Sequence, residues 1–177
     1  MIRQINTYGE AEEYINSIPK FTGKSSMEDT RKFLMHLGNP ANNCNVIHIA
    51  GTNGKGSVCA YLCSVLKEAG ISVGMFTSPH LVSMRERIVV NGETVTKQEF
   101  LYAYRYVADR LSNLPADLAG KDYHPSFFEF LFFMAMVLFE RAGVEYAVLE
   151  TGLGGRLDAT NSVEHKKLCV ITSIGYD

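Results

Sequence analysis

The sequence lacks the cysteine pattern of a disulfide-bonded or zinc-binding protein. It has four cysteines, none of them in C-x-x-C spacing, and Cys59 and Cys63 fall on one helical face, where packing is their ordinary role. Dense disulfide frameworks are typical of small secreted domains. We therefore expect reduced, mostly buried thiols and a cytoplasmic protein.

An excess of charge of one sign is also missing, as is a long apolar run. The net charge of −2 gives no basic field of the kind that nucleic-acid-binding proteins present. The stretch FFEFLFFMAMVLF, residues 127–139, is short for a membrane span and contains Glu129. The first residues, MIRQINTYGEAEEY, lack the apolar segment of a secretory signal. We expect a monomer that acts on small molecules, with no nucleic-acid or membrane partner.

What the sequence does contain is an alternation of apolar strands and helices, in a chain of 177 residues that is long enough to bury a core. Capping residues and breakers predict helices over about 8–17, 27–37, 55–69, 96–111 and 125–143. Apolar runs predict strands at NVIHIA (45–50), SVGMF (72–76), EYAVLE (145–150) and LCVITSI (168–174). Pro19 and Gly23 are expected to end the first helix.

This alternation predicts an α/β fold, a mostly parallel sheet with helices on both faces. The runs VIHIA, YAVLE and LCVITSI are almost continuously apolar, so we expect strands buried on both faces. The segment ERIVVNGETVT predicts a short strand pair that turns at Asn91 and Gly92. We expect PADLAGKDYH to be a loop and Pro125 to lie in the first turn of the following helix.

Ligands of such sheets bind beyond the carboxyl ends of the strands, and GTNGKGS (51–57) follows the first strand there. It resembles a phosphate-binding loop, although its spacing departs from G-x-x-x-x-G-K-[ST]. Its three glycines allow the backbone N–H groups to approach phosphate oxygens. Lys55 supplies a cation for the outer phosphates, and Ser57 supplies a hydroxyl for phosphate or Mg²⁺. An ordinary strand-to-helix turn is the less favoured interpretation.

Other candidates follow the neighbouring strands. Glu150 ends the EYAVLE strand and is a candidate Mg²⁺ ligand, because Mg²⁺ takes one or two carboxylates. In TSPHL (77–81), Ser78 is within reach of a metal, while His80 either binds metal or forms hydrogen bonds inside the loop. One of the two arginines in MRER (84–87) faces substrate or phosphate, or both are solvated. His48 is expected to be a satisfied core histidine.

Two further segments complete the set of candidates. TGLGGRLDATN (151–161), called the glycine-rich loop below, allows a ligand to approach the backbone closely and carries Arg156 and Asp158. HPSFFE (124–129) offers Ser126 and aromatic rings at a helix start. Such rings are more often core residues than ligand platforms, although a flat ring substrate could stack on one of Phe127 and Phe128.

Taken together, NVIHIAGTNGKGS, TSPHLVSMRERI, SFFEF and VLETGLGGRLDATN resemble the folylpolyglutamate synthases and bifunctional dihydrofolate synthases of the Mur ligase superfamily. The resemblance spans the whole chain. It implies a P-loop fold like the Mur ligase central domain. It also implies an ATP-dependent ligase that activates a folate or dihydropteroate carboxylate as an acyl phosphate, which the amino group of glutamate then attacks.

The resemblance also implies roles for individual residues. Catalysis would rest on Lys55 and Glu150. The ATP phosphates would be held by Asn53, Gly54, Lys55, Gly56 and Ser57. Mg²⁺ would be coordinated by Ser57, Ser78 and Glu150. The folate or dihydropteroate would be bound by Ser126, Phe128, Arg156, Leu157, Asp158 and Ala159.

The chain departs from the family in one segment and stops early. KSSMEDTRKFL (24–34) stands where many members carry a G-L-x-R stretch, which leaves the accepted substrate open. The sequence ends at Asp177, just after the predicted strand LCVITSI. We therefore expect residues 1–177 to be a truncated N-terminal ATP-binding domain without its C-terminal glutamate-ligase domain, inactive alone. The alternatives are the nucleotide-binding domain of another Mur-type amino-acid ligase and a P-loop regulatory module without ligase chemistry.

Overall fold

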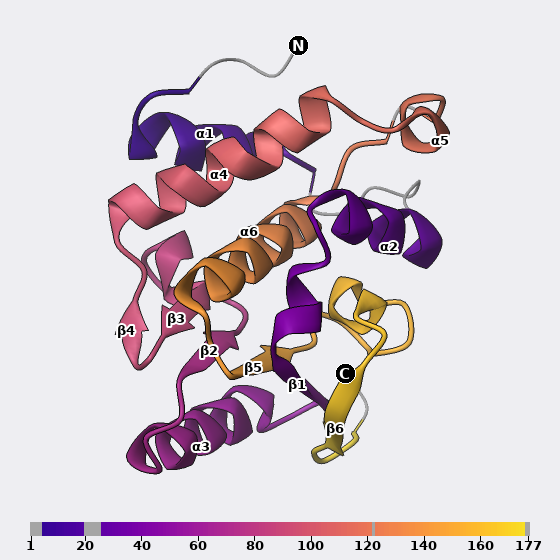
Figure 1. Ribbon diagram of the computed structural model, residues 1–177. Coiled ribbons are helices and arrows are strands. Elements are labelled where there is room, and N and C mark those ends of the chain that lie inside the picture. The colour runs from indigo at the N-terminus through magenta and orange to yellow at the C-terminus, as the bar shows by residue number, and fades with distance from the viewer. Residues whose placement is uncertain (1–4, 20–25, 122, 176–177) are drawn as a thin grey trace.

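The computed structural model describes residues 5–19, 26–121 and 123–175 (Figure 1). The helices are α1 (Tyr8–Ser17), α2 (Met27–His36), α3 (Lys55–Glu68), α4 (Lys97–Ser112), α5 (Ala116–Ala119) and α6 (Phe127–Ala142). The strands are β1 (Asn45–Ala50), β2 (Val73–Phe76), β3 (Ile88–Val90), β4 (Glu93–Thr94), β5 (Tyr146–Glu150) and β6 (Lys166–Ile171). Three 3₁₀ helices join them, η1 (Pro40–Asn43), η2 (Met84–Arg87) and η3 (Ala159–Ser162).

All six strands form one sheet in the order β4-β3-β2-β5-β1-β6. The neighbours β2, β5, β1 and β6 run parallel to one another, while β3 and β4 add an antiparallel extension next to β2. The turn between β3 and β4 has positive φ at Asn91 and Gly92, as the sequence predicted for this strand pair. The predicted α/β class and mostly parallel sheet are therefore confirmed.

Side-chain caps explain where the helices begin. Four helices begin with a capping box, in which the side chain of the capping residue accepts a hydrogen bond from the backbone N–H three residues on. The acidic side chain at that third residue accepts a hydrogen bond from the backbone N–H of the capping residue. The capping residues are Thr7, Ser26, Thr96 and Ser126. At the other end of α6, Gly143 takes the left-handed conformation that commonly closes a helix. These signals are local, so the sequence predicted the starts of α1 and α2 after the caps Thr7 and Ser26.

Two expectations near α6 were wrong. The segment 115–124 contains the short helix α5 and is not a simple loop. Pro125 stands before the helix, because Ser126 occupies the capping position and α6 begins at Phe127. The helix break expected at Gly23 lies outside the described residues.

The helix α6 lies at the centre of the molecule. Figure 1 shows α3 on one side of the sheet and α6 on the other, with α4 and α1 beyond α6. Because α6 packs against both the sheet and these outer helices, nearly every side chain from Phe127 to Phe139 is buried. This position accounts for the apolar run FFEFLFFMAMVLF. Among the described residues, no helix is both long and apolar enough to cross a membrane.

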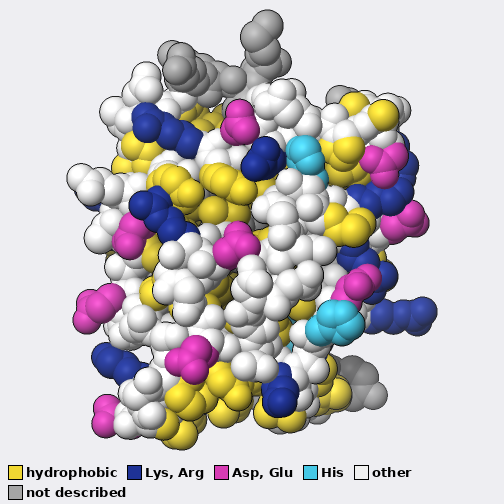
Figure 2. Space-filling view, in the orientation of Figure 1, with side chains coloured by type: hydrophobic (Ala, Val, Ile, Leu, Met, Phe, Trp, Pro, Cys, Tyr) yellow, Lys and Arg dark blue, Asp and Glu magenta, His cyan; other side chains and the backbone are white. Residues whose placement is uncertain are grey.

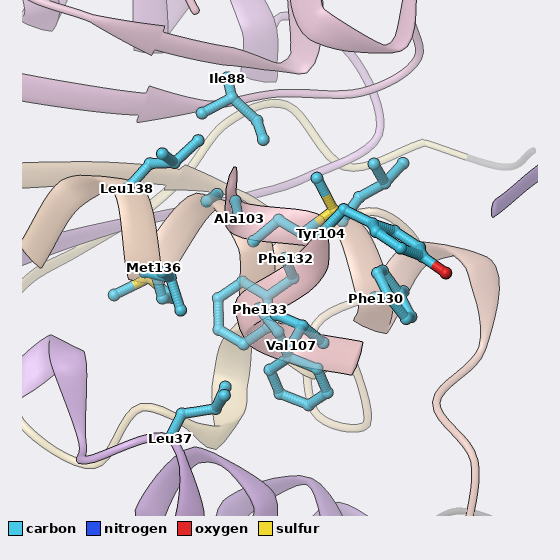
Figure 3. Close-up of a cluster of buried hydrophobic side chains, with 14 of the residues drawn as sticks. Leu37, Ile88, Ala103, Tyr104, Val107, Phe130, Phe132, Phe133, Met136 and Leu138 are labelled. Atoms are coloured by element: carbon cyan, nitrogen blue, oxygen red, sulfur yellow. The ribbon is translucent and has the colours of Figure 1, made fainter. Parts of the chain in front are cut away.

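Aromatic rings fill much of this core (Figure 3). Phe133 packs on Phe33 of α2 with ring centroids 4.8 Å apart, and Phe130 stacks on Tyr104 of α4 at 5.6 Å. These contacts connect α6 to helices far away in the sequence. The core thereby holds the helices on one face of the sheet as one unit.

The strand β6 differs from the sequence expectation, because most of its side chains are exposed. Leu168 and Ile171 are 47% and 67% exposed. The strand lies at the edge of the sheet, and α3 packs against β1, β2 and β5. An apolar run indicates that a strand can be buried, but it does not indicate whether the strand lies at the centre or at the edge of the sheet. For the same reason Cys169 is exposed, whereas only Cys59 is fully buried among the four free thiols.

Candidate functional site

The parallel strands bring several loops to one edge of the sheet. Ile49 pairs with Glu150, Phe76 pairs with Leu149, and Ala50 pairs with Ile171, so these strands end at nearly the same level. The segments that follow them, beginning at residues 51, 77, 151 and 172, therefore start side by side. Such an edge is where open α/β sheets bind their ligands.

The phosphate-binding loop, residues 51–57, has the geometry that its glycines allow. Gly51 and Gly54 have φ values of +134° and +84°, and Gly54 is the residue that precedes α3. The helix thus directs its N-terminal N–H groups into the loop, which favours an anion there. The ammonium group of Lys55 donates hydrogen bonds to Gly51 O at 2.7 Å and Thr52 O at 3.2 Å.

Hydrogen bonds from the segment after β6 hold this loop in place. The Thr172 hydroxyl donates to Asn53 O at 2.7 Å, and Thr52 N donates to Ser173 O at 2.9 Å. A Cβ atom on Gly51 would come 2.1 Å from the Thr172 hydroxyl oxygen, so only glycine allows this approach. The sequence reasoning missed Thr172 and Ser173, although their place after a strand parallel to β1 was the available signal.

Glu150 is the point on which three of the loops converge. Its side chain is buried, and one carboxylate oxygen accepts a hydrogen bond from Ser78 N at 2.8 Å. The two carboxylate oxygens lie 3.7 and 3.8 Å from where a Cβ of Gly56 would be. The structure thus joins the phosphate-binding loop, the segment after β2 and the end of β5, as the candidate metal site requires.

Opposing effects act on the Glu150 carboxyl group. Burial has the largest effect and raises its pKa above the ordinary value, although the Ser78 N–H and the positive charges of Lys55 and Arg87 act in the opposite direction. A buried carboxylate beside two cations and a hydroxyl-bearing loop is a chemically suitable environment for Mg²⁺, which favours hard oxygen ligands. No group of three or more His, Cys, Asp or Glu side chains among the described residues could hold a metal. Hydroxyl groups and phosphate oxygens would therefore have to complete the coordination.

The two arginines of η2 have different surroundings. Arg87 is buried, donates from Nε to His80 Nδ1 at 2.8 Å, and lies over the Phe127 ring at 5.4 Å. Arg85 instead donates to Val95 O at 3.0 Å. Arg87 is thus the arginine close to Glu150, and His80 forms a hydrogen bond within the rim. The sequence left both questions open.

The start of α6 and the glycine-rich loop are in contact. Ser126 uses its hydroxyl to cap α6, accepting from Glu129 N at 3.3 Å. The Phe128 ring packs against Gly152, where an added Cβ would come 2.6 Å from a ring carbon, and against Phe76 with centroids 5.4 Å apart. Phe128 is partly exposed, so it borders the site and the core at once.

The remaining candidates on the glycine-rich loop divide by exposure. Arg156 and Leu157 are exposed, whereas Asp158 and Ala159 are buried. The Asp158 carboxylate accepts hydrogen bonds from its own loop, from Gly152 N at 2.8 Å among others. All four residues lie on the loop that follows β5, but of these four only Arg156 and Leu157 present their side chains to solvent.

His48 is a satisfied interior histidine. Its Nε2 lies 2.7 Å from the hydroxyl of Thr160, and the side chain is 5% exposed. Burial, with a smaller contribution from the Lys166 charge, lowers its pKa to about 4. The sequence-based interpretation as a core histidine is therefore confirmed.

Comparison with known proteins gives a consistent set of matches. No protein-family model matches the sequence. The dihydrofolate synthase/folylpolyglutamate synthase of Bacillus subtilis is 39% identical over 171 residues, which are 96% of this chain and 39% of that protein. The chain spans less than two-fifths of the length of the curated relatives it matches.

Solved structures agree in sequence and in fold. A bifunctional folylpolyglutamate synthase/dihydrofolate synthase from Yersinia pestis, complexed with AMPPNP and a Mn ion, superposes with a TM-score of 0.84 at 30% identity, over 99% of this chain and 40% of that one. A folylpolyglutamate synthase complex with AMPPCP and folate gives 0.84 at 33% identity, over 97% of this chain and 41% of that one.

Proposed function

We propose that this chain, which belongs by sequence and fold to the folylpolyglutamate synthase family of Mur-type ligases over the stretch that it spans, is the ATP- and folate-binding part of an ATP-dependent ligase. The ligase would join L-glutamate to a folate or to dihydropteroate through an acyl phosphate. The observation that carries the proposal is the convergence of Gly56, Ser78 and Glu150 at one edge of the sheet.

The nucleotide side of this site would use residues 53–57. The N–H groups at the start of α3 and the Lys55 ammonium would bind the ATP phosphates, because both present positive charge to the same loop. Ser57, Ser78 and Glu150 would hold Mg²⁺, which when bound offsets the repulsion between the phosphates and the substrate carboxylate. The nucleotide and Mn ion in the Yersinia pestis structure support this assignment.

The folate side would lie between the start of α6 and the glycine-rich loop. Phe128 offers a partly exposed ring for the pterin, and the neighbouring rim carries Ser126, Arg156, Leu157, Asp158 and Ala159. Phe76 and Gly152 hold the ring in place from two sides. The folate complex among the similar structures supports a folate as the substrate class.

The share of the relatives that the chain covers supports a domain assignment. We propose that residues 1–177 form an N-terminal ATP-binding domain and that a C-terminal ligase domain supplies the rest of the site. This chain alone should bind nucleotide weakly and should not ligate glutamate. Ligation by the isolated chain would overturn this assignment.

A cytoplasmic location and a monomeric state complete the proposal. All four cysteines are free thiols, as in a reducing compartment. Basic and acidic side chains are interspersed on the face shown in Figure 2, a distribution that suits small-molecule substrates better than nucleic acid. Light scattering on the purified protein would give its mass in solution.

The deciding experiment measures ADP release by the complete protein that carries this sequence. We expect glutamate-dependent ADP release with tetrahydrofolate, with dihydropteroate, or with both. Stimulation by neither acid would remove the proposal. Lys55→Ala should abolish turnover and leave the circular dichroism spectrum unchanged, because among the described residues the Lys55 ammonium group donates to carbonyls of its own loop and the side chain belongs to neither hydrophobic cluster.

A further inference from the structure

A buried line of hydrogen bonds runs from β1 to the glycine-rich loop. His48 Nε2 lies 2.7 Å from the Thr160 hydroxyl, which in turn donates to an oxygen of the Asp158 carboxylate at 2.6 Å. The same carboxylate oxygen accepts from Thr160 N at 3.0 Å. The other oxygen accepts from Gly152 N at 2.8 Å and Leu153 N at 2.9 Å.

The positions of the protons follow from this geometry. The Thr160 hydroxyl has one proton, and it points to the charged carboxylate, so the hydroxyl must accept from His48 Nε2–H. Asp158 then receives four hydrogen bonds, which is about the number that a carboxylate can accept. Its side chain is 6% exposed. Asp158 therefore has no acceptor site left for a ligand.

These bonds fix a piece of backbone that matters for the site. Gly152 and Leu153 follow Glu150 by two and three residues, and the backbone of Gly152 rests against the Phe128 ring. Bonds from N–H groups to a carboxylate are stronger than bonds between neutral groups. The carboxylate thus holds the loop against the ring from the side away from solvent.

We propose that Asp158 is a positioning residue that, braced by Thr160 and His48, fixes the Gly152–Leu153 backbone against Phe128 and thereby forms one wall of the folate site without touching the substrate. This proposal rests on the proposed function. It departs from the role that the family resemblance implies, in which Asp158 itself binds the substrate. Thr160 and His48 are residues that the resemblance leaves without a role.

The first test reads the hydrogen bonds directly. Thr160→Val removes the hydroxyl and keeps the shape, whereas Thr160→Ser keeps the hydroxyl. We expect amide hydrogen exchange at Gly152 and Leu153, measured by NMR, to be at least tenfold faster in Thr160→Val and close to wild type in Thr160→Ser. Equal protection in all three proteins would overturn the proposal.

The second test separates positioning from direct contact. In the complete enzyme, Thr160→Val and Asp158→Asn should both raise KM for the folate substrate several-fold, with KM for ATP nearly unchanged, and Thr160→Ser should restore the wild-type value. If Asp158 bound the substrate itself, Asp158→Asn alone would raise KM. An unchanged folate KM in Thr160→Val, despite faster exchange, would also refute the proposal.

The two proposals fail in different ways. Absence of folate-dependent ADP release in the wild-type enzyme would remove the proposed function, while the exchange measurement would still report on the hydrogen bonds. His48→Gln keeps an N–H donor toward Thr160, and His48→Leu removes it. This second pair keeps the test decisive if Thr160→Val does not fold, with faster exchange expected only in His48→Leu.

Discussion

Gly51 determines how closely the phosphate-binding loop and the end of β6 approach each other. Gly51→Ala would place a Cβ 2.1 Å from the Thr172 hydroxyl oxygen and would strain a backbone with φ +134°. We expect the free energy of unfolding to fall by about 2–4 kcal/mol, from steric overlap and strain together. Urea unfolding measures this loss. Nucleotide affinity should fall as well, because the loop must shift.

Gly54→Ala is the matched control within the same loop. Gly54 also has positive φ, but its Cβ would meet nothing within 4 Å. The variant should therefore lose only about 1–2 kcal/mol, the cost of the left-handed conformation. Equal losses in the two variants would contradict the role assigned to the contact with Thr172.

Glu150→Gln tests the proposed metal ligand. The amide keeps the size of the side chain and an oxygen that can accept from Ser78 N, but it loses the negative charge. Loss of a group that only hydrogen-bonds to a metal ligand lowers metal affinity roughly 10–100-fold. We expect the Mg²⁺ concentration needed for nucleotide binding to rise by at least this factor. Calorimetric titration of the nucleotide at several Mg²⁺ concentrations measures the change.

Glu145→Gln provides the control, because Glu145 directly precedes the opposite end of β5. Glu145 is exposed, and its carboxylate accepts from Ser72 N. The Mg²⁺ dependence should match that of the wild type. A wild-type response in Glu150→Gln would refute the assigned role of Glu150.

The sequence could predict that Glu150 and Ser78 lie together, because both follow strands of a parallel sheet. It could not distinguish Arg85 from Arg87, because both lie in the 3₁₀ helix η2, where packing decides which side chain turns toward Glu150. It also could not find the contact between Thr160 and His48, which are 112 residues apart. Long-range contacts between polar side chains leave no local pattern.

At the scale of elements, Gly74 in β2 sets the distance between the sheet and α6. A Cβ at this position would come 2.4 Å from a ring carbon of Phe139, which is fully buried. Gly74→Ala should lower the free energy of unfolding by about 1–3 kcal/mol, the usual cost of overpacking. Thermal or urea unfolding will show whether it does.

Gly9→Ala in α1 is the control, since a Cβ at Gly9 would meet nothing within 4 Å. Alanine favours a helix over glycine by up to about 1 kcal/mol, so this variant should be slightly more stable than the wild type. A stabilised Gly74→Ala protein would mean that the sheet and α6 separate easily.

Helix starts and the β3–β4 turn were predictable because a few neighbouring residues determine them. The exposure of β6 was not, since it depends on which strands α3 covers. Pro125 was wrongly expected in the first turn of α6, because Ser126 and Glu129 together form the capping box that starts this helix at Phe127. Local signals therefore located the elements, and their mutual packing decided how exposed each became.

At the scale of the whole molecule, His48 makes stability depend on pH. Its pKa is about 4 in the folded protein and near 6.5 in the unfolded chain. Between these two pH values the unfolded chain therefore binds a proton at His48 and the folded protein does not. The stability that this histidine preserves is complete above pH 6.5 and is lost as the pH falls toward 4. The loss amounts to about 2–3 kcal/mol.

His48→Gln should remove this part of the pH dependence while keeping a donor to Thr160. Urea unfolding at pH 7 and pH 4.5 compares the two proteins, and the difference between them should grow at the lower pH in favour of the variant. Parallel pH profiles would contradict the assignment. The carboxyl groups of the protein titrate in both the wild type and the variant, so their contribution to the pH dependence cancels in the comparison.

The position of α6 also bears on how the chain is made. A ribosome releases the polypeptide from its N-terminus, and domains fold largely in that order. The helices that cover α6, which are α1, α2 and α4, all precede it in the sequence, as do the strands β1 and β2. The apolar helix α6 therefore emerges only after most of the elements that cover it have been synthesised, and β5 begins within four residues of its end.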